Sequence, residues 1–229
     1  IIIQLCYTTK NMFDRDTIDT FKLIMEKYPD RILDVYDSFS SNQYASKDWL
    51  IEKLNEYPHH FKCKTLDKKF GISILGSWYG LLAYRMLEKF TLKKIGNIDC
   101  IDFDPRAKPI AKRLWKKVDA DNLKNGILTY IKFIEKDIKE LDKLNDPIVI
   151  CTSCEHLEQD IIYSTIEKLD EHTLIVLQSN NYKEIGQHIN YVDTMENFAN
   201  QYVGKLRNMK FYEKDFVKYK RFMVIGTKI

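Results

Sequence analysis

The sequence predicts an α/β fold with a mostly parallel, seven-stranded sheet that is covered on both faces and closed by an antiparallel hairpin. From residue 71 on, short apolar runs of β type alternate with segments of helical periodicity. The last two apolar runs lie too close together for a helical crossover, so they must pair antiparallel. Only helical patterns occur before residue 65, which predicts an N-terminal helical extension.

Composition limits the class of protein. The chain has 229 residues, of which 45% are hydrophobic and 30% charged, as is typical of a soluble globular protein. No stretch approaches the roughly 18 apolar residues of a membrane span, so we expect no membrane partner. The net charge of +3 is weaker than that of a dedicated nucleic-acid module. Five scattered cysteines and no convincing signal peptide predict reduced thiols and a cytoplasmic location.

The first 65 residues carry two helical patterns separated by a polar stretch. The first helix is predicted over residues 16–28, where Pro29 stops it. A second helix is predicted over residues 48–57, with Ser46 as its N-cap. We interpret residues 1–65 as a helical extension or lid and residues 66–229 as the α/β domain.

The α/β domain is predicted to contain five parallel strands and a terminal hairpin. Strands are expected over residues 72–75, 98–103, 130–134, 147–152 and 173–178, and helices over 81–90, 105–118 and 158–169. The hairpin strands are expected over 211–219 and 222–227, with Lys220 and Arg221 as the turn. Short connections between alternating strands and helices indicate a doubly wound sheet.

The stretch around which this domain is organised lies between the first strand and the first helix. The apolar run ends at Gly76, and a helical pattern resumes after Gly80. Glycine has no Cβ, so such a turn lets a ligand approach the backbone and the first amides of the helix. A turn required only for packing is the alternative.

This turn, the order of strands and helices, and the segment Cys100-Ile101-Asp102-Phe103-Asp104-Pro105 resemble the class I S-adenosylmethionine-dependent methyltransferases, which have a Rossmann-like fold. The resemblance covers about residues 71–229. It implies that Gly76, Ser77, Trp78 and Gly80 cradle the methionine part of the cofactor. Trp78 and Tyr79 stand where that family usually has small residues.

The same resemblance implies further cofactor contacts. Asp102 is the residue that would bind both ribose hydroxyls, since an ionised carboxylate offers two acceptor oxygens. Phe103 would pack on the adenine, Asp137 would accept from its amino group, and Ile138 would flank the ring. Capping of a helix is the alternative for Asp102, and a solvated loop position is the alternative for Asp137.

The segment from Cys151 to His156 follows the fourth strand, where that family places catalytic or substrate-facing groups. We expect Thr152 beside the cofactor and Glu155 and His156 as the catalytic pair, since histidine suits a general base. Packing of His156 at the start of the next helix is the alternative. Structural zinc needs four ligands, and no second cysteine pair accompanies Cys151 and Cys154, so we predict no metal site.

Substrate recognition is expected from Gln178, Asn180 and Asn181 after the fifth strand, and from Lys47 if the polar stretch folds over the crevice. Turn formation is the alternative for the first three. The predicted function is methyl transfer from S-adenosylmethionine to a nucleic acid, a small molecule or a protein. The alternatives are an aminopropyl-transferase-like enzyme and a non-catalytic Rossmann-like scaffold protein. Nothing in the sequence indicates the oligomeric state.

Overall fold

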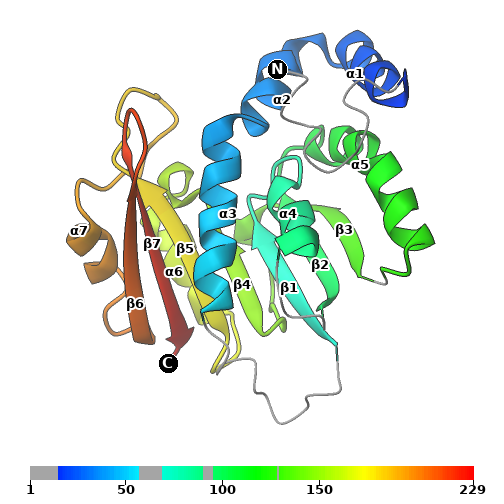
Figure 1. Cartoon of the computed structure of the whole chain (residues 1–229). Coiled ribbons are helices and arrows are strands. Elements are labelled where there is room, and N and C mark those ends of the chain that lie inside the picture. The colour runs from blue at the N-terminus through cyan, green and yellow to red at the C-terminus, as the bar shows by residue number, and fades with distance from the viewer. Residues whose placement is uncertain (1–14, 57–68, 90–94, 128) are drawn as a thin grey trace.

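One seven-stranded sheet forms the centre of the molecule, with strand order β3-β2-β1-β4-β5-β7-β6 (Figure 1). The computed structural model describes residues 15–56, 69–89, 95–127 and 129–229. Strands β1 to β5 are parallel, whereas β7 pairs antiparallel with both β5 and β6. The strands are β1 (Phe70–Leu75), β2 (Ile95–Asp102), β3 (Tyr130–Glu135), β4 (Ile148–Cys151), β5 (Leu174–Asn180), β6 (Leu206–Asp215) and β7 (Lys220–Lys228). The predicted fold class is confirmed.

Helices cover both faces of the sheet. They are α1 (Arg15–Lys27), α2 (Ile32–Ser38), α3 (Ser41–Asn55), α4 (Leu81–Lys89), α5 (Ala107–Lys124), α6 (Gln159–Glu167) and α7 (Met195–Asn200), with short 3₁₀ helices η2 (Pro29–Arg31), η3 (Ile138–Glu140) and η4 (Cys154–His156). In Figure 1, α3 and α4 lie side by side on the near face, while α6 lies behind the sheet. Across the described residues, no helix has the length and apolar character that a bilayer span requires.

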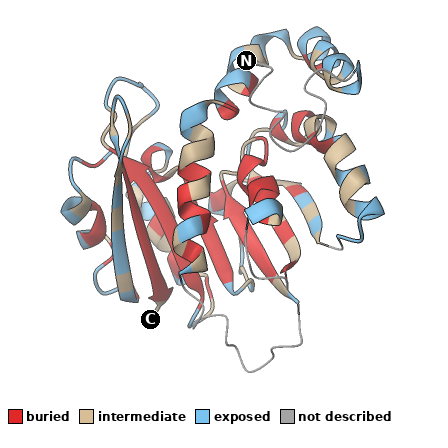
Figure 2. Cartoon of the chain, viewed as in Figure 1, coloured by how far each residue is buried: buried red, intermediate tan, exposed pale blue. Residues whose placement is uncertain are grey.

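Two apolar clusters fill the spaces between the sheet and its helices. In β5, Leu174 and Val176 join the cluster under α3, α4 and α5, whereas Ile175 and Leu177 join the cluster under α6 and α7. This alternation follows from the two-residue side-chain period of a strand. Figure 2 shows the central strands buried throughout and the outermost strand β6 largely exposed. The central strands are apolar on both faces because both faces are covered.

The N-terminal extension differs from the prediction. Helix α3 begins at Ser41, and its N-cap is Ser40, whose Oγ accepts from the Gln43 amide. The predicted start at Asp48 with Ser46 as cap is therefore wrong. Ser46 is instead buried inside α3 and donates to Gln178. Within this polar stretch Ser46 and Lys47 are buried and contact Gln178 and Thr152, whereas Ser41 and Asn42 are exposed to water.

Helix α3 belongs to the same core as the sheet. Trp49, Leu50, Ile51 and Leu54 are buried in the cluster that also contains strand residues of β1, β2 and β4. The predicted domain boundary at residues 65 and 66 lies outside the described residues. That boundary stays a prediction.

Other element ends also differ from the prediction. The hairpin turn spans residues 216–219, where the Phe216 amide donates to the Tyr219 carbonyl, so Lys220 and Arg221 begin β7 rather than form the turn. Strand β5 extends to Asn180, because β7 supplies antiparallel partners for Gln178, Ser179 and Asn180. The short helix α7 was not predicted.

Candidate functional site

A tight turn joins β1 to α4 at the carboxyl edge of the parallel strands. Gly76 and Gly80 have φ angles of +62° and +82°, in the left-handed region that strains other residues. A Cβ on Gly76 would lie 2.8 Å from Ser153 Oγ, and one on Gly80 would lie 2.7 Å from the Phe133 ring. The positive φ therefore favours glycine at both positions, and at Gly80 the Phe133 ring also leaves no room for a side chain.

Asp102 ends β2 beside this turn. Its Oδ2 accepts from the Trp78 amide at 2.7 Å, and its Oδ1 accepts from the Asp104 amide at 3.1 Å. Burial raises the pKa of Asp102, and the hydrogen bond from the Trp78 amide opposes that shift. Each carboxylate oxygen keeps a further acceptor position. The carboxylate thus holds the turn against the end of β2 and remains able to accept from a ligand.

The two large residues of the turn pack against the core. Trp78 stacks on Tyr79 with ring centroids 5.3 Å apart. Tyr79 is 1% exposed, and its carbonyl accepts from the Trp115 indole at 2.6 Å. The Ser77 amide donates to the Ile101 carbonyl, which fixes the turn to β2 a second time. Tyr79 is therefore part of the hydrophobic core, and Trp78, which is partly buried, packs against it.

Of the three predicted adenine contacts, two have a local role in the structure. Phe103 is 73% exposed at the end of β2 and is available to a ligand. Asp137 caps η3, where its Oδ1 accepts from the Lys139 amide at 2.9 Å. Ile138 is buried in the cluster under α6. For Asp137 and Ile138 the structure thus supplies a local role in capping and packing.

Sequence reasoning did not identify Arg31, which reaches this end of the sheet from η2. Its guanidinium pairs with Asp104 and, at 2.8 Å, with Asp34. Its positive charge also lowers the pKa of Asp102, against the effect of burial. Sequence reasoning could not place this arginine at the site, because Asp102 and Asp104 lie in a distant part of the chain.

A buried polar cluster lies at the carboxyl ends of β4 and β5, beneath α3. It joins residues from four separate segments of the chain. Its members are Ser46, Lys47, Thr152, Glu155, Gln178, Asn180 and Arg221. Five of them were predicted as site residues: Lys47, Thr152, Glu155, Gln178 and Asn180. The cluster therefore unites predicted cofactor, catalytic and substrate positions in one network.

Lys47 is the cation that α3 brings into this cluster. Its Nζ donates to Thr152 Oγ1 at 3.2 Å. Burial first, and then the neighbouring Arg221 charge, lower the pKa of Lys47 to about 7, while Glu155 and Cys151 oppose the shift. The amine therefore changes its charge near neutral pH, as groups that exchange protons in a site often do.

Glu155 is the buried anion of the same network. Its Oε1 accepts from Asn180 Nδ2 at 2.7 Å and lies 3.6 Å from Arg221 Nη1. Its Oε2 is buried and has no hydrogen-bond partner among the described residues. Arg221 also donates to the Thr152 carbonyl and, at 3.3 Å, to Gln178 Oε1. Arg221 was not predicted as a site residue, because the hairpin turn was expected at that position.

Asn181 lies outside the cluster. Its Oδ1 accepts from the Lys220 amide at 2.8 Å, where β5 meets the start of β7. The side chain thus holds the end of the hairpin. The structure brings Gln178 and Asn180 to Glu155 and Lys47, but it does not bring Asn181 there.

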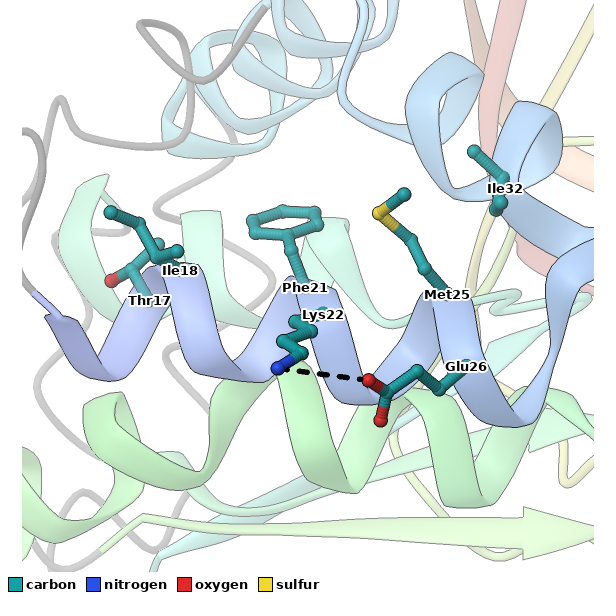
Figure 3. A pocket seen from close by; sticks show the side chains of 7 residues that line it. All are labelled: Thr17, Ile18, Phe21, Lys22, Met25, Glu26 and Ile32. Atoms are coloured by element: carbon teal, nitrogen blue, oxygen red, sulfur yellow. Dashed lines mark ion pairs between the residues drawn. The ribbon is translucent and has the colours of Figure 1, made fainter.

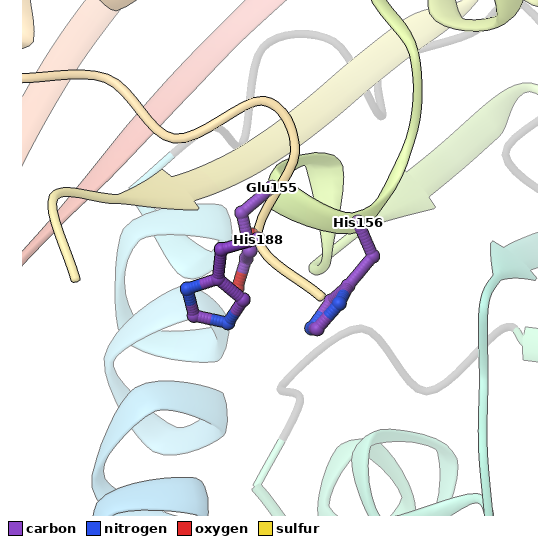
Figure 4. Close-up of side chains that lie close together, drawn as sticks. All are labelled: Glu155, His156 and His188. Atoms are coloured by element: carbon purple, nitrogen blue, oxygen red, sulfur yellow. The ribbon is translucent and has the colours of Figure 1, made fainter. Parts of the chain in front are cut away.

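His156 follows Glu155 and stands at the surface of the site. Its ring lies 4.7 Å from that of His188, and its Nδ1 lies 3.2 Å from the Gln187 carbonyl. Partial burial lowers the pKa of His156, although the Glu155 carboxylate opposes this shift. Figure 4 shows Glu155, His156 and His188 close together, drawn from η4 and from the loop after β5. Sequence reasoning missed His188, since its loop carries no motif.

An apolar pocket of about 420 Å³ lies elsewhere, along α1 (Figure 3). Its lining residues are Thr17, Ile18, Phe21, Lys22, Met25, Glu26 and Ile32. Lys22 and Glu26 pair with each other at 3.8 Å on its rim. None of these residues belongs to the glycine turn or to the buried polar cluster, so this pocket is separate from the candidate site.

Comparison with solved structures identifies the fold. The N-methyltransferase NodS from Bradyrhizobium japonicum matches with a TM-score of 0.51 and 12% identity, over 76% of this chain and 96% of that chain. A structure from Galdieria sulphuraria, assigned as a sarcosine dimethylglycine methyltransferase, matches with a TM-score of 0.54 and 10% identity, over 92% and 98%. An O-methyltransferase family protein from Burkholderia thailandensis matches with a TM-score of 0.50 and 12% identity, over 96% and 74%.

No protein-family model matches the chain, and no curated protein matches its sequence. The likeness therefore lies in the backbone, at identities far below those that carry function. The mostly parallel seven-stranded sheet and the terminal antiparallel hairpin agree with the resemblance inferred from the sequence. The chain has the fold of the class I S-adenosylmethionine-dependent methyltransferases.

Proposed function

We propose that this protein transfers a methyl group from S-adenosylmethionine to an acceptor that binds against the buried polar cluster. The observation that carries the proposal is Asp102, whose carboxylate ends β2 and holds the glycine turn by the 2.7 Å bond to the Trp78 amide. Open α/β sheets bind ligands outside the carboxyl ends of such strands. The free acceptor positions of this carboxylate suit the two hydroxyl groups of a ribose.

The cofactor would then lie along the turn from Gly76 to Gly80, with the exposed Phe103 ring beside the adenine. Its methyl group would face the end of β4, where Thr152 and Glu155 are held. This orientation places donor and acceptor on neighbouring strands of one edge. Alignment of two bound reactants is the main contribution that a methyltransferase needs to make.

The transfer itself needs a nucleophile and a destination for its proton. The acceptor atom attacks the methyl carbon, the carbon–sulfur bond breaks, and S-adenosylhomocysteine leaves with the electron pair. The proton of the acceptor passes to His156, whose lowered pKa keeps the ring neutral at neutral pH. Glu155, fixed by Asn180, stands next to it and stabilises the imidazolium that forms.

The charges of the site favour this reaction over the aminopropyl-transferase alternative. That alternative needs acidic groups around an amine acceptor. Among the described residues of the cluster, Lys47 and Arg221 are basic and Glu155 alone is acidic. A polycationic amine would be repelled, whereas a neutral acceptor or one with a carboxylate group is accommodated.

One observation favours the scaffold alternative. Tyr79 fills part of the core at the glycine turn, and Trp78 stacks on it, at positions where small residues are usual for cofactor binding. A protein that lost its cofactor would be free to acquire such side chains. Direct measurement of cofactor binding separates the two functions.

The test is calorimetric titration of the folded protein with S-adenosylmethionine and S-adenosylhomocysteine. We expect saturable binding, and we expect Asp102→Asn to weaken it about 10- to 100-fold, because hydrogen bonds to a charged group are worth about 1.5–3 kcal/mol. Asp99→Asn is the matched control, since it makes the same change on the same strand, where Asp99 accepts from Asn97.

Thermal unfolding would show that each variant is folded. Absence of binding in a folded wild-type protein would establish the scaffold alternative. Equal affinity of wild type and Asp102→Asn would remove Asp102 from the ribose site, while leaving methyl transfer to be tested with candidate acceptors.

A further inference from the structure

Three potential metal ligands converge at the surface of the candidate site. Glu155 and His156 come from η4, and His188 comes from the loop after β5 (Figure 4). One ligand atom from each residue lies within 4.8 Å of the other two. The distance between ligand atoms around tetrahedral zinc is about 3.4 Å, so small side-chain rotations complete the arrangement.

Both histidines are held in the tautomer that metal binding requires. His156 Nδ1 lies 3.2 Å from the Gln187 carbonyl, and His188 Nδ1 lies 2.6 Å from the Tyr182 carbonyl. A carbonyl oxygen only accepts, so each Nδ1 must carry the hydrogen, and each Nε2 keeps its lone pair. Histidine ligands in metal sites are typically oriented by this kind of hydrogen bond from the second nitrogen.

Glu155 offers the third ligand. Its Oε1 is occupied by Asn180 and lies near Arg221, whereas its buried Oε2 has no hydrogen-bond partner among the described residues. An unpartnered buried oxygen of this kind costs free energy in the folded state. A bound cation would remove that cost. Oε2 is therefore the oxygen of Glu155 that is available to bind a cation.

We propose that Glu155, His156 and His188 bind a single divalent transition-metal ion, with zinc as the ion that fits best. Two imidazole nitrogens and one carboxylate oxygen are the ligand set of catalytic zinc, and they leave a coordination position open. An acceptor oxygen or nitrogen bound there would lose its proton more readily. His156 would then act as a ligand, and the ion would take over the role of proton removal.

The surrounding charges set the strength of this site. Arg221 lies 3.6 Å from Glu155 Oε1, and its positive charge opposes the binding of a cation by this carboxylate. Lys47 donates to Thr152, and its charge interacts with that of Glu155, so the ammonium form of Lys47 also opposes a cation. The inference does not rest on methyl transfer, because the ion would bind in the absence of S-adenosylmethionine.

The experiment is titration of the chelator-treated, full-length protein with zinc chloride, followed by calorimetry. We expect one equivalent to bind, and His188→Gln to weaken binding by at least about 100-fold, since even an outer-shell change costs 10- to 100-fold. His156→Gln should have the same effect. His172→Gln is the matched control, because His172 is an exposed histidine that contacts Arg207 outside the triad.

Circular dichroism would establish that all three variants are folded. Zinc affinity unchanged in both His156→Gln and His188→Gln would place the ion elsewhere, for instance on the buried thiols of Cys151 and Cys154, and would overturn the proposal. The absence of saturable binding to the wild-type protein would overturn it as well. Neither result depends on whether the protein binds S-adenosylmethionine.

Discussion

Lys47 illustrates how burial changes the chemistry of one side chain. It is buried between α3 and the ends of β4 and β5, near Arg221, Glu155, Cys151 and Thr152. The low polarity and the Arg221 charge disfavour the ammonium form, so the pKa of Lys47 falls to about 7. In the unfolded chain Lys47 keeps its ordinary pKa. The difference in pKa between the folded and unfolded states makes the free energy of unfolding depend on pH.

We therefore predict that Lys47 makes stability depend on pH. Between about pH 7 and pH 10.5 the unfolded chain holds a proton on Lys47 that the folded chain lacks, so the free energy of unfolding rises with pH. The slope from this one proton is at most about 1.4 kcal/mol per pH unit. Below pH 7 both states hold the proton, and the folded state bears the full cost of a buried charge.

The pH dependence can be measured by urea unfolding of wild type and Lys47→Met from about pH 6 to about pH 9. The free-energy difference between the two proteins should shift in favour of wild type as pH rises. Lys124→Met is the control, because Lys124 is exposed at the end of α5 and should give curves parallel to wild type. Parallel curves for Lys47→Met would show that Lys47 titrates normally.

At the scale of elements, the turn between β1 and α4 is the best defined connection of the site. Its two glycines adopt positive φ, and its Trp78 amide donates to Asp102 at the end of β2. The turn is therefore held by backbone conformation and by the neighbouring strand together. Replacing either glycine should therefore lower the free energy of unfolding, even in the absence of any ligand.

We predict that Gly80→Ala destabilises the protein more than Gly126→Ala. Both glycines have positive φ, so alanine costs each about 1–2 kcal/mol in backbone strain. The new Cβ in Gly80→Ala would also lie 2.7 Å from the Phe133 ring. A Cβ added at Gly126 would have no other atom within 4 Å. That overlap should add about 1–3 kcal/mol, measurable by urea unfolding. Equal losses would mean that Phe133 moves aside without cost.

At the scale of the whole molecule, the N-terminal helices are part of the fold rather than an attachment to it. Trp49, Leu50, Ile51 and Leu54 are at most 5% exposed, and they pack in the same cluster as the central strands. Fully burying each such side chain contributes about 1.5–3 kcal/mol. The sum is comparable to the total stability of a domain, which is about 5–15 kcal/mol.

A fragment of residues 66–229 should therefore fail to unfold cooperatively in urea, because removal of α3 exposes one face of the sheet. A fragment of residues 15–229, which keeps α1, α2 and α3, is the control and should fold. Far-UV circular dichroism and urea titration measure both. Cooperative unfolding of the shorter fragment would support residues 66–229 as an independent domain.

Local patterns in the sequence were sufficient to predict the sheet and the start of the site. Apolar runs of strand length, separated by helical periodicity, identify the five parallel strands, because each face of a buried strand must be apolar. Gly76, Gly80 and Asp102 were predicted because the turn and the end of β2 depend on neighbouring residues. Strands and turns of this kind can be predicted because they depend on residues that are close together in the sequence.

Only the tertiary structure decided which distant residues share the site. Lys47, Arg221 and His188 meet Glu155 or its neighbours through packing of α3, β7 and a loop onto one edge of the sheet. Asn180 was expected after the fifth strand and Gln178 at its end, yet antiparallel pairing with β7 places both in a buried strand. Buried polar residues find partners across the fold, and no local sequence pattern records those partners.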